Sequence, residues 1–271
     1  MKALDEVRGW PVETVAAGYL DRLRRRRTVG ATAASRPLAS VTKPLFAYAV
    51  LVAVEEGTLS LDQPAGPPGA TIAHLLAHAS GLGDSPGLTL APVGKRRIYS
   101  NAGFEELGRE LAAASAMSAS EYFHQAVVEP LGLTSTALGP SPAHGATSSV
   151  DDLLVMAAEW LRPTLISAET MARATSPQFP ELGGVLPGYG RQEPNPWGLG
   201  FELKGAKHPH WTAATNSPVT FGHFGQAGTF IWIDPVIEVG CVALTNRPFG
   251  PWAIEAWPAL AEAVVAEATG G

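Results

Sequence analysis

The sequence has little of several features that would place it in a specialised class of protein. It has one cysteine in 271 residues, Cys241, which excludes an internal disulfide and a zinc site of paired cysteines. Its longest apolar stretch, Pro44 to Val54, is far too short to cross a bilayer. It has no G-x-x-x-x-G-K-[ST] phosphate loop and no G-x-G-x-x-G loop in a suitable context. We therefore expect no metal and no cofactor, and we interpret Cys241 as a core residue.

Charged residues are also few, and acidic residues slightly outnumber basic ones. Nineteen Lys and Arg stand against 25 Asp and Glu, a formal net charge of −6, which disfavours nucleic-acid binding. Residues 1–8 lack the apolar stretch of a signal peptide. We expect a cytoplasmic protein that binds neither nucleic acid nor membrane. The exception is residues 22–27, with five arginines in six, which we interpret as an exposed hairpin tip or, alternatively, a contact for an acidic partner.

Patterning predicts strands at both ends of the chain and helices between them. We expect strands at 15–20, 28–32, 197–203, 229–234 and 238–245, and helices at 40–57, 71–78, 102–114, 119–129, 149–161, 167–174 and 252–268. Pro258 indicates a start or a kink in the last helix. Residues 175–196 hold five Pro and four Gly, which is typical of a long surface loop. These elements predict an α/β fold whose sheet uses both termini, with a helical region at about 61–195 and a cleft between the two parts.

One motif at the start of a buried helix could support nucleophilic catalysis. Ser40 and Lys43 are three residues apart and so share a helix face. An apolar setting disfavours the charged form of Lys43. A neutral amine beside a hydroxyl can accept its proton and so make Ser40 a nucleophile. Alone, however, S-x-x-K is a weak signal that recurs by chance.

Two later segments strengthen that interpretation. Tyr99 and Asn101 stand two residues apart before a helix, where Tyr99 could relay a proton and Asn101 could orient the substrate or Lys43. Residues 221–228, Phe-Gly-His-Phe-Gly-Gln-Ala-Gly, lead into a strand, and their glycines allow a ligand to approach the backbone closely.

Two other patterns carry less weight. Residues 83–87 match G-x-S-x-G, but no strand precedes Ser85, as the nucleophile elbow of an α/β-hydrolase requires. His74 and His78 have the i, i+4 spacing of a helical metal site, but Leu75 stands where H-E-x-x-H has its glutamate. We interpret Ser85 as a loop serine and the two histidines as packing residues.

The order S-x-x-K, Y-x-N, H-x-G resembles the serine β-lactamase and penicillin-binding-protein superfamily, and the surrounding sequence resembles its class C and esterase branch. Further similar segments are His74–Leu82 to H-L-L-x-H-x-S-G-L, Tyr99–Phe104 to Y-S-N-x-G-Y, Glu129–Thr136 to P-L-G-M-x-x-T and Trp197–Phe201 to Y-G-L-G-W. The resemblance runs from about residue 37 to 247. It implies one β-lactamase/transpeptidase-like domain over 1–271, with an antiparallel sheet flanked by terminal helices (about 1–60 and 196–271) and a helical subdomain (about 61–195).

By position, the resemblance implies a role for each motif residue. Ser40 would form an acyl-enzyme, with Lys43 and Tyr99 sharing the general-base and general-acid work. The substrate-binding residues would be Asn101, on the acyl side, His223 at the basic position of the third motif, Phe224, Gly225 and Gln226. The backbone N–H groups of Ser40 and Gln226 would form the oxyanion hole. Trp197 and Trp211 are further candidates for lining the cleft.

Phe224 departs from the pattern in a way that bears on the substrate. Relatives that hydrolyse β-lactams or D-Ala-D-Ala peptides usually have Thr or Ser there, whose hydroxyl helps to bind the substrate carboxylate. Phenylalanine cannot donate a hydrogen bond, and an unpartnered buried carboxylate is costly. We therefore expect a carboxylesterase acting on a small-molecule ester or amide. A β-lactamase or D,D-peptidase and a catalytically idle, partner-binding protein remain alternatives, and the sequence does not indicate the oligomeric state.

Overall fold

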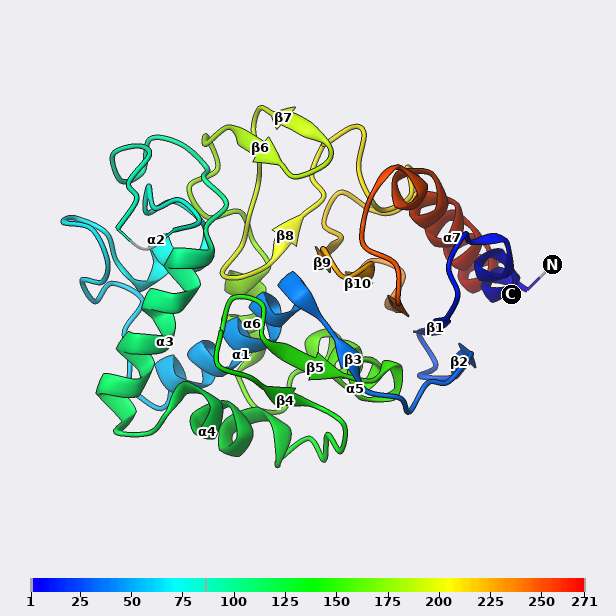
Figure 1. Ribbon diagram of the computed structural model, residues 1–271, viewed down its shortest axis with the longest axis horizontal. Helices are drawn as coiled ribbons and strands as arrows, with labels where there is room; N and C mark the ends of the chain where they lie inside the picture. Colours follow the sequence, from blue (N-terminus) through cyan, green and yellow to red (C-terminus); the bar gives the residue numbers. More distant parts are fainter. Residues whose placement is uncertain (1, 86, 271) are drawn as a thin grey trace.

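A six-stranded antiparallel sheet organises the structure, a computed structural model that describes residues 2–85 and 87–270 (Figure 1). Its strand order is β2-β1-β11-β10-β9-β8. The strands are β1 (Val15–Leu20), β2 (Arg26–Val29), β8 (Glu202–Leu203), β9 (Phe221–Gly225), β10 (Thr229–Asp234) and β11 (Val239–Thr245). The N-terminal strand β1 pairs along its length with the C-terminal strand β11, from Val15 opposite Thr245 to Leu20 opposite Gly240. The sheet is therefore built from both ends of the chain, as expected.

Side chains of the central strands alternate between two separate cores. On β10, Ile231 and Ile233 belong to the larger core, whereas Phe230 and Trp232 belong to the smaller one. This is the period of two that a strand imposes, here with apolar residues on both faces. The expected core residue Cys241 is buried on the Trp232 side. The sheet must therefore be covered on both sides.

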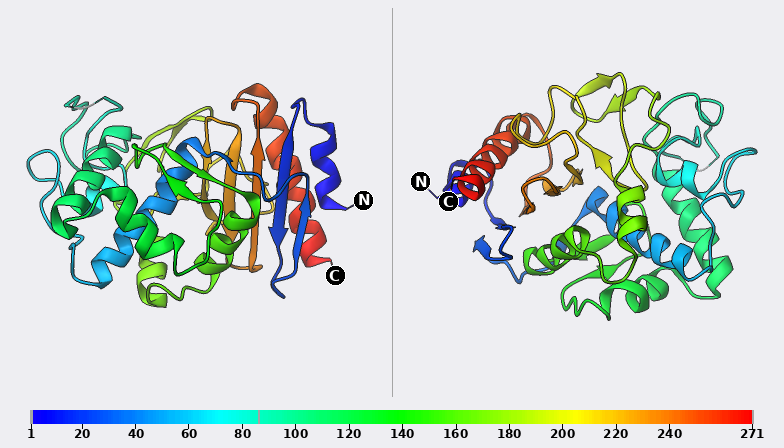
Figure 2. Two further views of the ribbon diagram at one scale, coloured as in Figure 1. Left: turned by 60° about the horizontal axis from the view of Figure 1, so that its bottom comes forward. Right: turned by 180° about the vertical axis from the view of Figure 1, so that it is seen from behind.

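Helices supply both covers. The C-terminal helix α7 (Pro251–Thr269) and the 3-10 helix η1 (Ala3–Gly9) pack together on one face, and the two chain ends lie beside each other there (Figure 2). On the other face α5 (Val150–Leu161) contacts β1, β10 and β11, and α1 (Thr42–Glu55) contacts β9. Helix α1 is buried almost all round, which explains its nearly uninterrupted apolar sequence.

Except for β3, which precedes α1, the remaining elements lie between α1 and β8 in the sequence. The helical ones are α2 (Ile72–Leu76), α3 (Asn101–Ser115), α4 (Ala119–Phe123) with a following π-helical turn η3 (His124–Val128), and α6 (Ala168–Ala174). A three-stranded sheet, β3-β5-β4, consists of β3 (Arg36–Pro37), β5 (Ala146–Ser148) and β4 (Ala137–Leu138). A hairpin of β6 (Gly184–Leu186) and β7 (Gly190–Gln192) completes them. Among the residues that the structure describes, no helix combines the length and apolarity needed to cross a membrane.

Several predicted boundaries were wrong. The second strand is Arg26–Val29 rather than 28–32, so Arg26 and Arg27 lie within the strand, and only the preceding residues form the turn. The predicted strand at 197–203 shrinks to Glu202–Leu203, because the backbone turns at Gly200, where φ is 88°. The predicted loop at 175–196 contains the β6–β7 hairpin, and the last helix begins at Pro251 and continues through Pro258.

The turn at Gly200 generates a prediction about stability. A Cβ there would lie 2.1 Å from the Cβ of Ala47 on α1, whereas at Gly57, also left-handed with φ of 77°, it would meet nothing within 4 Å. Either substitution to alanine costs about 1 kcal/mol for the left-handed backbone. We expect Gly200→Ala to cost a further 1–3 kcal/mol, on the order of an overpacked core. Urea unfolding of both variants measures the difference, and equal losses would contradict the described contact.

Candidate active site

Ser40 lies in a constrained turn just before the buried helix. The 3-10 turn η2 (Ala39–Val41) precedes α1, and Ala39 has a positive φ of 47°, which is rare for a residue with a side chain. The hydroxyl of Thr229 on β10 donates to the carbonyl of Leu38 at 2.8 Å and so ties this turn to the sheet. Backbone strain of this kind clusters at functional sites. The sequence predicted a helix from residue 40, but the regular helix begins at Thr42.

Lys43 extends from the first turn of α1 into a fully buried position. Its Nζ lies 3.4 Å from the Ser40 Oγ, 2.6 Å from the Asn101 Oδ1 and 2.9 Å from the Ala143 carbonyl oxygen. Burial lowers the pKa of Lys43 to about 7, against the opposing influence of more distant carboxylates. The neutral form of Lys43, which can act as a base, is therefore accessible at neutral pH.

Tyr99 and Asn101 reach the same place from the start of α3. The ring of Tyr99 packs against His78, with centroids 4.8 Å apart, and the Lys43 Nζ lies 4.7 Å from its centre. Burial raises the pKa of the Tyr99 hydroxyl beyond its ordinary value of 10, although contact with Ser40 opposes this. Tyr99 is therefore protonated at neutral pH. Asn101, for which sequence alone left two roles open, orients Lys43 through its amide oxygen.

The third motif forms β9, whose backbone runs close to the Ser40 turn. A Cβ at Gly225 would lie 2.3 Å from the Leu38 carbonyl oxygen and 3.2 Å from the Ser40 nitrogen. Only glycine allows this approach of the β9 backbone to the Ser40 turn. The ring of His223 is buried, and its Nδ1 donates to the Phe224 carbonyl at 2.6 Å.

The Phe224 side chain belongs to an aromatic cluster beneath α7. Its ring centroid lies 4.9 Å from Phe249, 5.8 Å from Trp257 and 5.8 Å from Trp211. The position that carries a hydroxyl in many relatives is thus part of the apolar core between the sheet and α7.

A cavity of about 260 Å³ joins these side chains. It is lined by Ser40, Asp84, Tyr99, Asn101, Leu186, Pro187, Trp197, Glu202, His223, Phe224 and Gln226. Lys43 is fully buried and does not line the cavity, and it contacts Ser40 from the interior of the protein. The three sequence motifs therefore meet at one cavity, together with Trp197 and the β6–β7 hairpin. Trp211, the other tryptophan candidate, lies outside the lining and donates its indole N–H to Glu202.

Sequence reasoning missed a buried ionic cluster in the cavity wall. Glu202 is buried and bound by Lys207, by the indole of Trp211 and by His210, whose Nε2 lies 3.0 Å from the carboxylate. Although burial opposes it, the positive charge of Lys207 and contact with His210 lower the pKa of Glu202, so it remains ionised. The members of this cluster lie within ten residues of one another, from 202 to 211, and this short spacing was the only signal in the sequence that could have indicated it. Strand patterning does not reveal such a cluster.

A buried arginine, also missed, holds the Tyr99 segment in place. Arg97 has 2% exposure and donates to four carbonyl oxygens, those of Ala77, Gln178, Phe179 and Asn195. These acceptors come from three segments distant in sequence. Arg97 therefore fixes the strand-like stretch that leads into Tyr99.

The weaker sequence candidates are not part of this cavity. Ser85 lies in the loop after α2, and Pro86 of the same G-x-S-x-G match is outside the described residues. His74 stacks on Phe179, and the Nδ1 of His78 accepts a hydrogen bond from the Ser100 N–H. Within residues 2–85 and 87–270 no group of three or more His, Cys, Asp or Glu is arranged to hold a metal ion.

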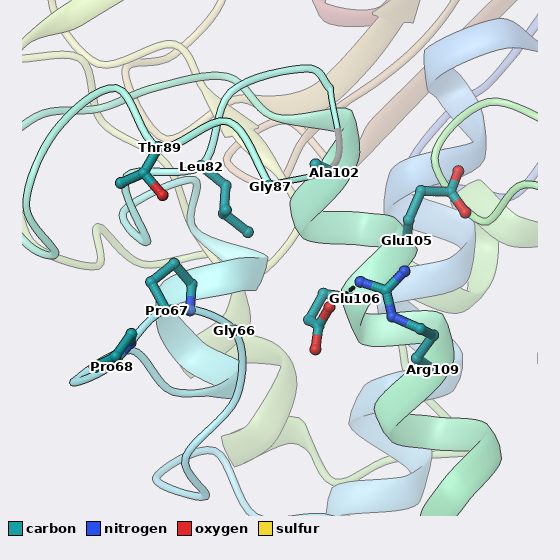
Figure 3. Close-up of a pocket in the computed structure, with 10 residues that line it drawn as sticks. All are labelled: Gly66, Pro67, Pro68, Leu82, Gly87, Thr89, Ala102, Glu105, Glu106 and Arg109. Carbon is teal, nitrogen blue, oxygen red and sulfur yellow. Dashed lines mark hydrogen bonds and ion pairs between the residues drawn. The ribbon is translucent and has the colours of Figure 1, made fainter.

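A second cavity, of about 390 Å³, lies beside α3 (Figure 3). It is lined by Gly66, Pro67, Pro68, Leu82, Gly87, Thr89, Ala102, Glu105, Glu106 and Arg109. The charged groups there have partners already, since Arg109 pairs with Glu106 and Glu105 accepts from Ser141. No residue of the three motifs lines it, so the smaller cavity at Ser40 is the candidate active site.

The sequence model of the Beta-lactamase family matches residues 1–265. The chain belongs to the beta-lactamase family. A crystal structure of a beta-lactamase from Mycobacterium bovis is 51% identical, with a TM-score of 0.97, and the match covers 99% of this chain and 100% of that one. No curated protein sequence matches the chain.

Two more distant structures share the fold of this beta-lactamase family member. Simvastatin synthase (LovD) from Aspergillus terreus is 16% identical, with a TM-score of 0.79 over 98% of this chain and 93% of that one. EstCE1, a hydrolase with promiscuous acyltransferase activity, is 19% identical, with a TM-score of 0.77 over 97% and 95%. The expected β-lactamase/transpeptidase fold is confirmed, and family membership makes the protein a serine hydrolase of this superfamily.

The environment of Lys43 predicts a pH dependence of stability. Its pKa is about 7 in the folded protein and near 10.5 when unfolded, so between these values the unfolded chain binds one more proton. The free energy of unfolding of the wild type, minus that of Lys43→Met, should therefore rise between about pH 7 and pH 10, by up to about 1.4 kcal/mol per pH unit. Urea unfolding of both proteins at pH 6, 7, 8 and 9 checks this, and a pH-independent difference would show that Lys43 stays charged.

Arg97 supports a second prediction. Replacing it with glutamine leaves buried carbonyl oxygens without a donor, and we expect a loss of about 3 kcal/mol or more in the free energy of unfolding. Arg109→Gln is the control, because that side chain is 64% exposed and, among the residues that the structure describes, its one ion pair is with Glu106. Its loss should stay below about 1 kcal/mol. Similar losses in the two variants would argue against the positioning role of Arg97.

Proposed function

We propose that this serine hydrolase is a carboxylesterase that acts on small-molecule esters through an acyl-Ser40 intermediate. The observation that carries the proposal is the arrangement around Ser40: a buried Lys43 at 3.4 Å, whose pKa burial lowers to about 7, and a protonated Tyr99 that lines the same cavity. A separation of 3.4 Å is long for a hydrogen bond, but such contacts commonly shorten when substrate binds.

In the acylation step, neutral Lys43 accepts the Ser40 proton as the Ser40 Oγ bonds to the ester carbonyl carbon. The carbonyl oxygen becomes an oxyanion, for which the N–H groups of Ser40 and Gln226 are the proposed donors. When the tetrahedral intermediate collapses, the C–O bond to the alcohol breaks, Tyr99 gives its proton to the departing oxygen, and Lys43 returns a proton to Tyr99. Water then releases the acyl group by the same steps in reverse order.

We assign the base role to Lys43 rather than Tyr99. A phenolate base requires loss of the Tyr99 proton, and burial raises the pKa of that group beyond its ordinary value. By contrast, Lys43 with a pKa of about 7 is available in its neutral form. A base whose pKa is close to the working pH is the efficient choice.

The lining of the cavity favours a neutral substrate. Phe224 is in the cavity lining but has no side-chain donor, since its ring packs beneath α7, and the Glu202 carboxylate, also in the lining, is ionised. Neither group stabilises the carboxylate of a β-lactam or a D-Ala-D-Ala peptide. The fold is shared with a hydrolase that has promiscuous acyltransferase activity, in line with ester chemistry.

A β-lactamase or D,D-peptidase is the second candidate, favoured by the relative at 51% identity, which is described as a beta-lactamase. In that case the carboxylate would have to find a donor other than residue 224. The proposed site remains cofactor-free in either case, because every step uses groups of the chain itself.

Comparative turnover tests the proposal. We expect p-nitrophenyl acetate and butyrate to be hydrolysed, with little cleavage of nitrocefin, and Ser40→Ala to lose at least 1,000-fold in kcat. Intact-mass spectrometry during turnover should show an acyl adduct on the wild type alone. Nitrocefin turnover that exceeds ester turnover would favour the β-lactamase alternative, and no labelling of Ser40 by a fluorophosphonate would indicate an idle protein.

The pH–rate profile tests the assignment of the base. We expect kcat/KM for p-nitrophenyl acetate to rise with pH and to level off above about pH 8, with a midpoint near the Lys43 pKa of about 7. The sign follows because the deprotonated amine is the active form. A rate that continued to rise up to pH 10 would instead point to Tyr99.

A further inference from the structure

His223 lines the cavity with a nitrogen that no group of the described residues satisfies. The side chain is 3% exposed, and its Nε2 is buried without a hydrogen-bond partner. Its ring lies 5.8 Å from that of Tyr99 and 5.5 Å from that of Trp197, centroid to centroid, and all three residues line the same cavity as Ser40. An unpartnered buried polar atom is costly, so its presence in a binding cavity points to a ligand.

The partner of the other ring nitrogen fixes the chemistry of this one. Nδ1 lies 2.6 Å from the Phe224 carbonyl oxygen, which can only accept, so Nδ1 carries a hydrogen. Burial, helped by the positive charge of Lys43, lowers the pKa of His223 to about 3. The imidazole is therefore neutral, and Nε2 is a bare lone pair that accepts a hydrogen bond.

Two comparisons within the molecule sharpen this reading. His78 also has an unpartnered buried Nε2, but its Nδ1 accepts from the Ser100 N–H, so that Nε2 carries the hydrogen, and His78 does not line the cavity. The unpartnered indoles of Trp160, Trp232 and Trp257 likewise lie away from it, whereas Trp197, which also lines the cavity, has an unpartnered indole N–H that is a donor and not an acceptor. His223 is the residue that offers a buried acceptor at the cavity wall.

We propose that His223 Nε2 is a specificity-determining acceptor that selects esters carrying a hydroxyl group within its reach. This inference rests on the proposed function and narrows its substrate class. The hydroxyl donates its hydrogen to Nε2, and the ester carbonyl lies at Ser40. A site with a committed acceptor rejects an analogue that cannot donate, because the acceptor is then left buried and unpaired.

Matched esters test the proposal in a pH-stat. Ethyl 3-hydroxybutyrate is compared with ethyl butyrate and ethyl 3-methoxybutyrate, and 2-hydroxyethyl butyrate with propyl butyrate and 2-methoxyethyl butyrate, so that the hydroxyl is placed on either side of the ester. We expect kcat/KM to favour one hydroxylated ester by about tenfold over both of its counterparts. The methoxy compounds retain an acceptor but lack the donor, which separates donation from polarity.

Variants assign the preference to His223. In His223→Phe it should fall to within about twofold, and in His223→Gln, whose amide oxygen is an acceptor, it should be partly restored. Trp232→Phe is the control, since it removes an unpartnered buried indole N–H outside the cavity and should leave the preference unchanged. Thermal unfolding verifies that each variant folds.

The outcomes separate this inference from the proposed function. Turnover of the unsubstituted esters without any hydroxyl preference, or a preference that survives His223→Phe, overturns the inference and leaves the esterase proposal standing. No turnover of any ester overturns both. Independently of substrate, the ¹⁵N shifts of His223 should show a protonated Nδ1 and a bare Nε2 from pH 5 to 8, and a protonated Nε2 would overturn the inference directly.

Discussion

Desolvation of one amine is the constraint on which the rest of the site depends. Lys43 is fully buried, and a charged ammonium in such a place is disfavoured unless it is paired. Its contacts, the Asn101 amide oxygen and the Ala143 carbonyl, are neutral groups that orient the amine without neutralising a charge. The result is a lysine whose pKa is about 7. In water the same side chain would hold its proton and could not activate Ser40.

The architecture supplies this burial from elements distant in sequence. Helix α1 is apolar on nearly every side because the sheet lies against one side of it and the helical region against the others. Strand β9 can approach the Ser40 turn because residue 225 is glycine, and the turn is tied to β10 through Thr229. Arg97 secures the segment that carries Tyr99. The substrate cavity is the remaining space between these fixed parts, so its chemistry follows from the side chains at its wall, above all His223 and Phe224.

The sequence predicted features that depend on local pattern and motif, and it failed where long-range contacts decide. Strand alternation and motif spacing are local properties of a sequence. They therefore predicted the antiparallel sheet built from both termini and the motifs at Ser40, Tyr99 and His223. The shortened β8 was not predicted, because the chain turns at Gly200, which packs directly against Ala47, a residue 153 positions earlier. Nor was the Glu202 cluster or Arg97, whose partners are brought together only by folding. The neutral state of His223 also depends on burial and on one carbonyl, neither of which a motif encodes.

The most direct test is an NMR titration of Lys43 in the folded protein, observed through the ¹³Cε resonance of labelled lysine and assigned by its absence in Lys43→Met. The account predicts a midpoint near pH 7, well below that of the exposed lysines, while the protein remains folded throughout. A Lys43 that stays protonated up to pH 10 would contradict it, because no neutral amine would then be present to activate Ser40.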